Sequence, residues 1–371
     1  MGEARPKLLF VISNDYGELS AATYFAMGGE FEVAMVLPPR LYASNQSSLP
    51  YESSRYESAG DVLEIIARKR PDVVLLFSGY LYAINGIFKL PELAELVKAV
   101  QNGGSRLVTS DPFLGLMSEI RPGMFSDRHP LKNAFVQHFS EVFKILKDVV
   151  HIYPADLADI GRTRNVGFFN AKIVIPADGA MGPVMRKRWL FVLSAEDYVA
   201  QTNLLGRQTI EQILIDRLRD AANQNRQPVV VAPEACIASI RSAAGEIPEA
   251  VLLGFCGLDD FRRLLLEAEY AFYWNILSNS ILWRAANGLP TFFFDRGHML
   301  MAIPAMYDLA MARYYAHASL PWLDQRRTLA GEELSRLSTS AVEAMSRAIN
   351  NMRRLPDPQR AIDLILRGNA S

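Results

Sequence analysis

The sequence predicts an α/β protein made of two doubly wound domains, each a parallel sheet covered by helices on both faces. The chain has 371 residues, more than one hydrophobic core usually serves. Short apolar runs alternate with longer amphipathic runs from the N-terminus onward, as they do in parallel sheets. This alternation restarts after residues 177–188, which combine Gly, Pro and basic side chains and are expected to form the linker.

The first domain is expected over residues 1–180. The apolar runs that predict its strands lie at 7–13, 31–37, 71–79 and 105–111, and the runs that predict helices lie at 14–27, 61–69 and 90–103. The polar stretch at 42–60 has the composition of a surface loop. A helix is predicted over 131–147, and strand-like pieces occupy 166–170 and 171–176.

The second domain is expected over residues 185–345, and the last segment, 346–371, is expected to pack back on the first domain. The apolar runs that predict strands lie at 189–197, 227–234, 250–255, 271–275 and 291–294. The helices are predicted over 207–223, 258–270, 279–287, 332–353 and 357–367. Asn287 and Gly288 are expected to end the short helix that begins near Asn279.

Composition excludes several classes of function. The net charge is −1 with both signs interspersed, so no nucleic-acid partner is expected. Two cysteines, Cys236 and Cys256, indicate a reducing compartment, and the five histidines show no metal-ligand spacing. No signal peptide or membrane-spanning apolar run is recognised, so the expected location is cytoplasmic, with no transmembrane segment. Whether the chain forms a homodimer is left open by the sequence.

Ligands of doubly wound sheets bind at the carboxyl ends of the strands. The residues that follow each predicted strand are therefore the candidates for a site. These turns are 13–18, 78–85, 110–119, 194–197, 232–234, 254–258, 275–280 and 295–298.

A series of motifs occupies residues 250–294, AVLLGFCGLDDFRRLLLEAEYAFYWNILSNSILWRAANGLPTFFF. This series resembles the donor-binding half of GT-B glycosyltransferases, in which a Gly-containing turn, a helix, a strand, a Ser-rich turn and a helix ending in Gly-x-Pro follow one another. Gly254–Phe255 and Gly288–Pro290 match the two ends of that order. The resemblance covers roughly residues 185–300 at motif level and the first half only in its strand–helix layout.

The resemblance implies two Rossmann-like domains facing a cleft and a nucleotide-sugar substrate, with no separate cofactor. The donor would be bound by Ser194, Glu234, Gly254, Phe255, Asn275, Ser278, Asn279, Ser280, Arg284, Asp295, Arg296 and His298. A helix that begins with Ser278, Asn279 and Ser280 presents backbone N–H groups and the positive end of its dipole, which suits a diphosphate. Plain N-capping is the alternative for these residues, and ordinary turn formation is the alternative for those at 295–298.

Arg284 is a departure from the family pattern. Many members carry a Glu three or four positions before the Gly of the helix stop, where it binds the donor ribose. A guanidinium accepts no hydrogen bond, so ribose recognition is expected to differ here. Two roles stay open for Arg284: a bidentate contact to a phosphate, and a salt bridge on a solvated helix face.

The family also implies a base in the first domain, after the first strand. Asp15 and Glu18 are the candidates, because a carboxylate serves as a base when burial raises its pKa. Their alternative role is that of cap and first-turn residues of a helix. Asn14, Tyr16, Gly17, Asp111 and Glu119 are the candidates for contacts to the acceptor.

The expected activity is metal-independent transfer of a sugar from a nucleotide donor to a small-molecule, glycan or protein hydroxyl. No Gly-x-Gly-x-x-Gly, P-loop or Gly-x-Ser-x-Gly motif is present, which argues against the enzymes that carry them. The Asp-x-Asp pair of metal-dependent glycosyltransferases is also absent, so no metal ligands are assigned. The rivals are a GT-B-like binding or scaffold protein without catalysis and a nucleotide-sugar epimerase on the same fold.

Overall fold

The computed structural model describes residues 4–13, 16–46, 48–84, 86–110, 132–155, 164–174, 186–245, 247–254 and 256–368. The chain divides into two compact units. Unit 1 comprises Met1–Lys172 and Asn351–Ser371, and unit 2 comprises Ile173–Asn350. The linker expected at 177–188 lies mostly outside the described residues. Among the described residues, no helix has the length and apolar character needed to cross a membrane.

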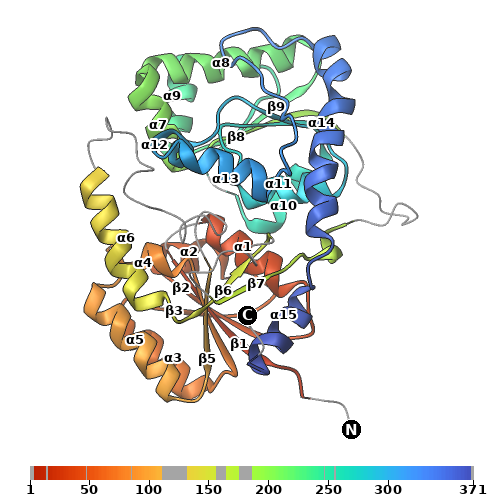
Figure 1. The fold of residues 1–371 in the computed structure, drawn as a ribbon. Coiled ribbons are helices and arrows are strands. Elements are labelled where there is room, and N and C mark those ends of the chain that lie inside the picture. Colours follow the sequence, from red (N-terminus) through yellow and green to blue (C-terminus); the bar gives the residue numbers. More distant parts are fainter. Residues whose placement is uncertain are drawn as a thin grey trace. The chain divides into compact units, whose positions relative to one another are not determined.

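Unit 1 is built on a seven-stranded parallel sheet with the order β3-β2-β1-β4-β5-β6-β7 (Figure 1). The strands are β1 (Lys7–Ile12), β2 (Glu32–Leu37), β3 (Glu52–Arg55), β4 (Val73–Phe77), β5 (Arg106–Ser110), β6 (Val150–Tyr153) and β7 (Arg164–Gly167). The order reverses between β1 and β4, where Ile12 pairs with Phe77. That reversal is the position at which doubly wound sheets hold ligands.

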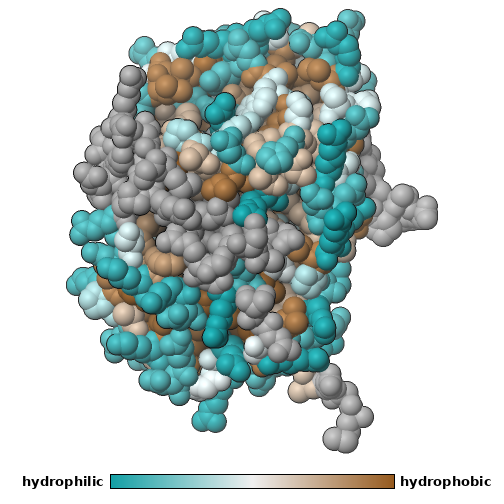
Figure 2. Space-filling view, viewed as in Figure 1, coloured by the Kyte–Doolittle hydropathy of each residue, from teal (hydrophilic) through white to brown (hydrophobic). Residues whose placement is uncertain are grey.

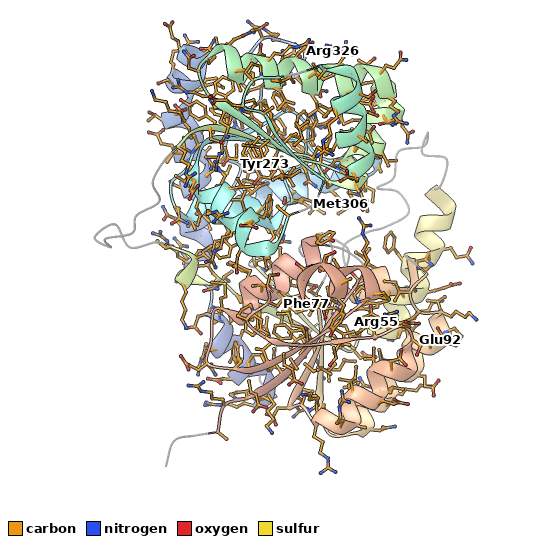
Figure 3. The ribbon with its side chains drawn as sticks, turned by 180° about the vertical axis from the view of Figure 1, so that it is seen from behind. Arg55, Phe77, Glu92, Tyr273, Met306 and Arg326 are labelled. Atoms are coloured by element: carbon orange, nitrogen blue, oxygen red, sulfur yellow. The ribbon has the colours of Figure 1, made fainter. Side chains whose placement is uncertain are left out.

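Helices cover both faces of this sheet (Figure 1). They are α1 (Tyr16–Ala26), α2 (Pro39–Asn45), α3 (Ala59–Lys69), α4 (Gly79–Ile84), α5 (Leu90–Asn102), α6 (Lys132–Leu146) and α15 (Pro358–Leu366). Helices α3, α5 and α6 lie on one face, while α1 and α15 lie on the other. In the interior, the Phe10 ring packs 6.1 Å from Phe25 and 5.1 Å from Phe77, which Figure 3 labels.

Unit 2 has a five-stranded parallel sheet with the order β10-β9-β8-β11-β12. Its strands are β8 (Arg186–Val192), β9 (Gln227–Val231), β10 (Val251–Leu253), β11 (Ala268–Tyr273) and β12 (Thr291–Phe293). Its helices are α7 (Ala195–Leu205), α8 (Arg207–Asn223), α9 (Glu234–Ala243), α10 (Leu258–Glu267), α11 (Asn279–Ala286), α12 (His298–Ala302), α13 (Ala305–Arg313) and α14 (Gly331–Met352), which crosses the boundary between the units.

Stacked aromatic rings form the centre of unit 2. The fully buried Phe272 ring lies 4.8 Å from Phe191, 5.6 Å from Phe292 and 5.7 Å from Phe294. Burial of each such side chain stabilises the fold by roughly 2–3 kcal/mol. Tyr273, the next residue of β11, is also interior (Figure 3). The aromatic strands therefore fix the sheet that carries the turns discussed below.

Two local predictions were wrong. The polar stretch at 42–60 was expected to be a loop, but it contains β3, which pairs with β2 from Ala34 to Leu37. An edge strand needs backbone pairing on one side only, so polar side chains are tolerated there. The second error is the strand expected at 171–176, because Ala171–Ile173 form a 3-10 turn. The helices expected at 207–223 and 279–287 are confirmed, and Gly288 follows the second with a positive φ of 64°.

The exterior is mainly hydrophilic on the face drawn in Figure 2. Large hydrophobic side chains are exposed at Val199 and Leu204 of α7, and at Trp322. Single exposed apolar side chains of this kind are ordinary on protein surfaces and indicate no partner by themselves.

A buried histidine in unit 1 gives stability a dependence on pH. Nδ1 of His151 lies 2.8 Å from the Val149 carbonyl, and Nε2 lies 3.0 Å from the Tyr80 hydroxyl. Burial lowers the pKa of His151 from 6.5 to about 4, against the backbone hydrogen bond to Val149, which raises it. The folded protein therefore holds this ring neutral in a range where the unfolded chain protonates it.

The free energy of unfolding should fall as the pH drops from about 6.5 towards about 4, because the unfolded state binds the proton first. One histidine shifted this far contributes roughly 3 kcal/mol across that window. Urea unfolding at several pH values gives the free energy of unfolding at each pH. This free energy should change less with pH in His151→Asn than in the wild type. His317→Asn, at an exposed position, serves as the control. Equal changes with pH in His151→Asn and the wild type would contradict this role.

Candidate functional site

The carboxyl ends of β8, β11 and β12 are adjacent in unit 2. Tyr273 of β11 pairs with Val192 of β8 on one side and with Phe293 of β12 on the other. The strand order of the sheet reverses at β8, so this edge is its switch point. The turns after the three strands carry most of the predicted donor-binding residues.

A buried carboxylate, Asp197 in the first turn of α7, joins these turns. Its Oδ2 accepts hydrogen bonds from Ser194 Oγ at 2.8 Å and from Asn275 Nδ2 at 3.1 Å. Its Oδ1 accepts from the backbone N–H of His298 at 2.8 Å and lies 3.2 Å from His298 Nδ1. Asp197 is 1% exposed. The structure therefore brings Ser194, Asn275 and His298 together around one carboxylate.

Gly297 permits the close approach of two of these turns. Its φ is 102°, which favours glycine, and a Cβ there would lie 3.1 Å from Asn275 Cγ. The backbone N–H of Ile276 also donates to the Arg296 carbonyl at 3.3 Å. A side chain at position 297 would therefore push the turn after β12 away from the turn after β11.

A second set of hydrogen bonds holds Asp295. Gln201 of α7 donates to the Asp295 carboxylate, and Gln325 Nε2 donates to Gln201 Oε1 at 3.3 Å. The fully buried Trp274 donates from its indole to Gln325 Oε1 at 2.7 Å. The guanidinium of Arg296 lies 4.2 Å from the centre of the Tyr307 ring. Asp295 and Arg296 thus have defined positions beside the Asp197 group, with Arg296 exposed.

The first turn of α11 differs from an ordinary capped helix start. The Ser278 hydroxyl does not cap the helix; it lies 2.7 Å from Ser280 Oγ, which is 3.1 Å from the Tyr273 hydroxyl. The Asn279 amide is buried, and neither its Nδ2 nor its Oδ1 has a hydrogen-bond partner in the described part of the chain. By contrast, Ser194 caps α7 by accepting from the Asp197 N–H at 3.1 Å.

Glu234 and Gly254 lie together at the ends of β9 and β10, on the side of β8 that is opposite to β11 and β12. A Cβ on Gly254 would lie 1.6 Å from Glu234 Oε2, so a larger residue would displace this carboxylate from its position. The Glu234 side chain is 70% exposed and makes an ion pair with Arg241 at 3.6 Å. Phe255, the other residue predicted in this turn, lies outside the described residues.

The structure corrects the role expected for Arg284. This side chain is fully buried and points to the amino ends of β11 and β12, away from the predicted phosphate site. Its five N–H donors are all used. They donate to the carbonyls of Leu265, Ala268, Glu269 and Pro290 and to the Thr291 hydroxyl. Burial lowers its pKa from 12.5 to about 10, so it stays a cation at neutral pH.

The candidates in unit 1 are only partly described. Tyr16 and Gly17 begin α1, and Tyr16 lies under the Arg40 guanidinium at 5.8 Å. Glu18, in the same turn, is 7% exposed. Asn14, Asp15, Asp111 and Glu119 lie outside the described residues. Glu18 is therefore the predicted catalytic carboxylate whose burial is established.

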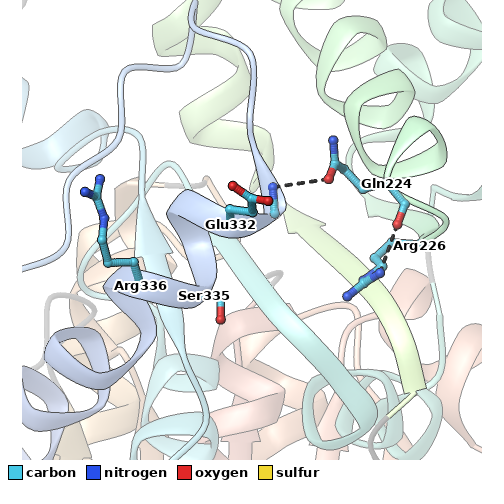
Figure 4. A pocket seen from close by; sticks show the side chains of 6 residues that line it. Gln224, Arg226, Glu332, Ser335 and Arg336 are labelled. Carbon is cyan, nitrogen blue, oxygen red and sulfur yellow. Dashed lines mark hydrogen bonds between the residues drawn. The ribbon is translucent and has the colours of Figure 1, made fainter.

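A surface pocket of about 540 Å³ lies elsewhere on unit 2 (Figure 4). Its lining residues are Gln224, Arg226, Gly331, Glu332, Ser335 and Arg336. They surround the amino end of β9, and Arg226 pairs with Glu269 through two bonds of 2.7 and 3.1 Å. This cation is neutralised, and the pocket lies at the amino end of β9, whereas the candidate site lies at the carboxyl ends of the strands.

The residues that organise the site are not among those predicted from the sequence. Asp197 belonged to a candidate turn but was not chosen, although Ser194 and Asp197 have the Ser-x-x-acid spacing of a helix start. That spacing could have revealed it. Gln201 and Gln325 are 124 positions apart, and no local pattern indicates that they meet.

No protein-family model and no curated protein matches the chain. Solved structures do match it along almost its whole length. A Listeria monocytogenes protein assigned as a UDP-N-acetylglucosamine 2-epimerase is 15% identical, with a TM-score of 0.55, covering 99% of this chain and 97% of that one. The spinosyn rhamnosyltransferase SpnG with thymidine diphosphate is 12% identical, with a TM-score of 0.51 and coverage of 97% and 99%.

The protein Os79 from O. sativa, in complex with UDP, is also similar to the chain. It is 12% identical, with a TM-score of 0.53, covering 98% of this chain and 100% of that one. These likenesses, together with two parallel sheets each bearing a switch point, confirm the predicted fold class. The chain has the GT-B fold.

If Arg284 is structural, Arg284→Met should lower the free energy of unfolding by at least about 3 kcal/mol, because buried carbonyls lose their donors. Urea unfolding measures this loss, and Arg336→Met, at an exposed position on α14, should cost less than about 0.5 kcal/mol. Near-wild-type stability in Arg284→Met combined with lost nucleotide binding would restore the phosphate role.

Proposed function

We propose that the carboxyl edge of unit 2 binds the diphosphate of a nucleotide sugar, and that the chain transfers this sugar to an acceptor hydroxyl without a metal ion or separate cofactor. The observation that carries the proposal is the start of α11. There a helix N-terminus coincides with a buried amide, Asn279, for which the described residues offer no hydrogen-bond partner. A buried amide without partners costs roughly 1–3 kcal/mol, which a bound ligand would relieve.

The phosphates would lie between the starts of two helices. Backbone N–H groups and the helix dipole favour an anion at the first turn of α11, and Ser278 and Ser280 add hydroxyls there. Ser194 begins α7 across the strand reversal. Asn275 and His298, both fixed by Asp197, supply further donors beside this position. The similar structures of SpnG and Os79 contain thymidine diphosphate and UDP respectively.

The nucleoside would extend towards Glu234 and Gly254. Arg284 donates to four main-chain carbonyls and to the Thr291 hydroxyl, and a guanidinium cannot accept a hydrogen bond from a ribose. The exposed Glu234 carboxylate, for which Gly254 leaves space, supplies such an acceptor. Asp295 and Arg296 would contact the sugar or the phosphates of the donor.

The acceptor hydroxyl would be deprotonated in unit 1 by Asp15 or Glu18. Glu18 is the better supported of the two, because its side chain is buried in the first turn of α1, at the strand reversal. A base is most effective when its pKa lies near the working pH, and burial of a carboxyl group acts in that direction.

One observation favours a second candidate function. The Listeria monocytogenes protein is assigned as a nucleotide-sugar epimerase and shares the fold over nearly the whole chain. An epimerase uses the same donor but inverts a carbon of the sugar instead of transferring it. Nucleotide binding alone does not separate the two functions, so products must be followed.

The first test is thermal unfolding with UDP, thymidine diphosphate and their sugars, in the presence of EDTA. A ligand at a hundred times its dissociation constant stabilises a protein by about 2.7 kcal/mol, which corresponds to several degrees in Tm. Asn279→Asp keeps the shape of the side chain but adds a negative charge beside the phosphates, and should raise Kd at least about tenfold. Ser280→Glu should abolish the shift.

The matched control is Asn223→Asp, at an exposed position in α8, which should bind as the wild type does. No stabilisation by any nucleotide, or equal binding by Asn279→Asp, would contradict the proposed site. Proton NMR of the bound sugar then distinguishes the outcomes. Transfer to an added acceptor supports the transferase, inversion at a ring carbon supports the epimerase, and binding without either supports a GT-B-like protein without catalysis.

A further inference from the structure

Unit 1 has its own group of polar side chains at the strand reversal between β1 and β4. Ser13 follows β1 and Ser78 follows β4, and these strands are neighbours with Ile12 paired to Phe77. The two serines are therefore the next residues in register at the carboxyl edge of the sheet. Tyr82 lies one turn further on, in α4.

The three hydroxyls of this group are buried, and the described residues offer them no hydrogen bond. Ser13 and Ser78 are fully buried, as is Tyr82. Neither Ser13 Oγ, Ser78 Oγ nor Tyr82 Oη has a partner within the described ranges of the chain. Each unsatisfied buried hydroxyl costs roughly 1–3 kcal/mol. Three such hydroxyls lie at one sheet edge. A polar ligand that binds all three explains them better than three unrelated packing faults do.

Contacts among the neighbours fix the position of Tyr82. The Tyr82 ring stacks on Phe88 at 4.9 Å, and the Tyr56 ring packs on the same Phe88 at 5.7 Å. The Tyr56 hydroxyl donates to the Ile12 carbonyl at 2.8 Å, directly before Ser13. Burial raises the pKa of Tyr82 well above 10, and the hydroxyl of Tyr56 and the carboxylate of Glu18 add to this. Glu18 lies in the first turn of α1, five residues after Ser13.

The turn after β4 is held in a constrained conformation. Ser78 has a φ of 51°, an unfavourable value for a residue with a side chain. Its N–H donates to Ser110 Oγ at 2.8 Å, and the Gly79 N–H donates to Thr109 Oγ1 at 3.1 Å. A Cβ on Gly79 would lie 2.5 Å from that hydroxyl, so glycine is required. Strain of this kind is retained where the surrounding structure imposes it, often at binding sites.

These observations also indicate the chemistry of the ligand. The backbone N–H groups of Ser78 and Gly79 are occupied, so this turn offers no nest for a phosphate. The groups without partners are hydroxyls, which both donate and accept. The carboxylate of Glu18 at the start of α1, which is the next helix after Ser13, repels anions. A neutral ligand with several hydroxyls, such as a sugar, satisfies these groups.

We infer that Ser13, Ser78 and Tyr82, together with Glu18, form a binding site for a neutral sugar in unit 1. Taken with the proposed function, on which this last step depends, the sugar is the acceptor, and its hydroxyl group lies near Glu18. The acceptor class is then a saccharide or glycoside, as opposed to a planar phenol. Binding of the sugar to unit 1 does not itself require a nucleotide.

The test is thermal unfolding without nucleotide, in the presence of methyl α- and β-hexopyranosides and N-acetylglucosamine at up to about 100 mM, a concentration that populates weak sites by mass action. 4-Methylumbelliferone and inorganic phosphate are the comparison ligands. At least one hexoside should raise the Tm of the wild type, and neither comparison ligand should do so. Stabilisation by phosphate or by the phenol alone, or no stabilisation by any hexoside, would overturn the inference.

Two variants identify the hydroxyls involved. Tyr82→Phe removes one unpaired hydroxyl, so the Tm without ligand should stay equal or rise, while the shift caused by the hexoside should fall at least about threefold. Ser13→Ala should behave in the same way. Tyr51→Phe, at a half-buried position just before β3, is the matched control and should keep the full shift.

Several results would count against the site. If Tyr82→Phe and Ser13→Ala both keep the full shift, the sugar binds elsewhere. A Tm lowered by several degrees in both variants, without ligand, would show that the hydroxyls already have partners. Stabilisation of the wild type by UDP is a separate readout of unit 2. Its absence would contradict the proposed function and leave the result with hexosides interpretable.

Discussion

The candidate site in unit 2 depends on the buried carboxylate of Asp197. Parallel strands end at the same edge, but the turns that follow them are not otherwise obliged to meet. Asp197 accepts hydrogen bonds from the turns after β8, β11 and β12, and so converts three separate chain segments into one polar surface. A charge that is 1% exposed is tolerated only when hydrogen bonds of this kind surround it. Gly297 then allows the turns to approach closely.

At the opposite edge of the same sheet, a second buried charge, the guanidinium of Arg284, is satisfied by the protein alone. Arg284 uses all five of its N–H groups, four on main-chain carbonyls and one on the Thr291 hydroxyl, close to the residues where β11 and β12 begin. Asn279, at the other end of the same helix, lacks partners among the described residues. The two ends of α11 therefore differ. The protein alone satisfies the hydrogen-bonding groups of Arg284, whereas a ligand would satisfy those of Asn279. Unit 1 repeats that contrast, because the hydroxyls of Thr109 and Ser110 accept hydrogen bonds while those of Ser13 and Ser78 have no partner among the described residues.

Much of the fold followed from local patterns. Alternation of apolar and amphipathic runs located most strands and helices, and the start and end of α11 were predicted from Asn279 and Asn287–Gly288. The edge strand β3 was missed because its stability comes from pairing with β2, which its own polar residues do not indicate. For the site, the turns were found but their organising residue was not, because the hydrogen bonds of Asp197 span up to 101 positions. Arg284 was misplaced for the same reason: only the packed structure reveals its five acceptors.

Binding of a nucleoside diphosphate at the carboxyl edge of unit 2 should protect the backbone amides of that edge. Amide hydrogen exchange of the full chain, with and without UDP or thymidine diphosphate, reports where such protection arises. We expect slower exchange in peptides covering 193–201, 273–286 and 294–302. Protection confined to the pocket around 224–226 and 331–336, or no change in those three segments at saturating nucleotide, would contradict binding at this edge.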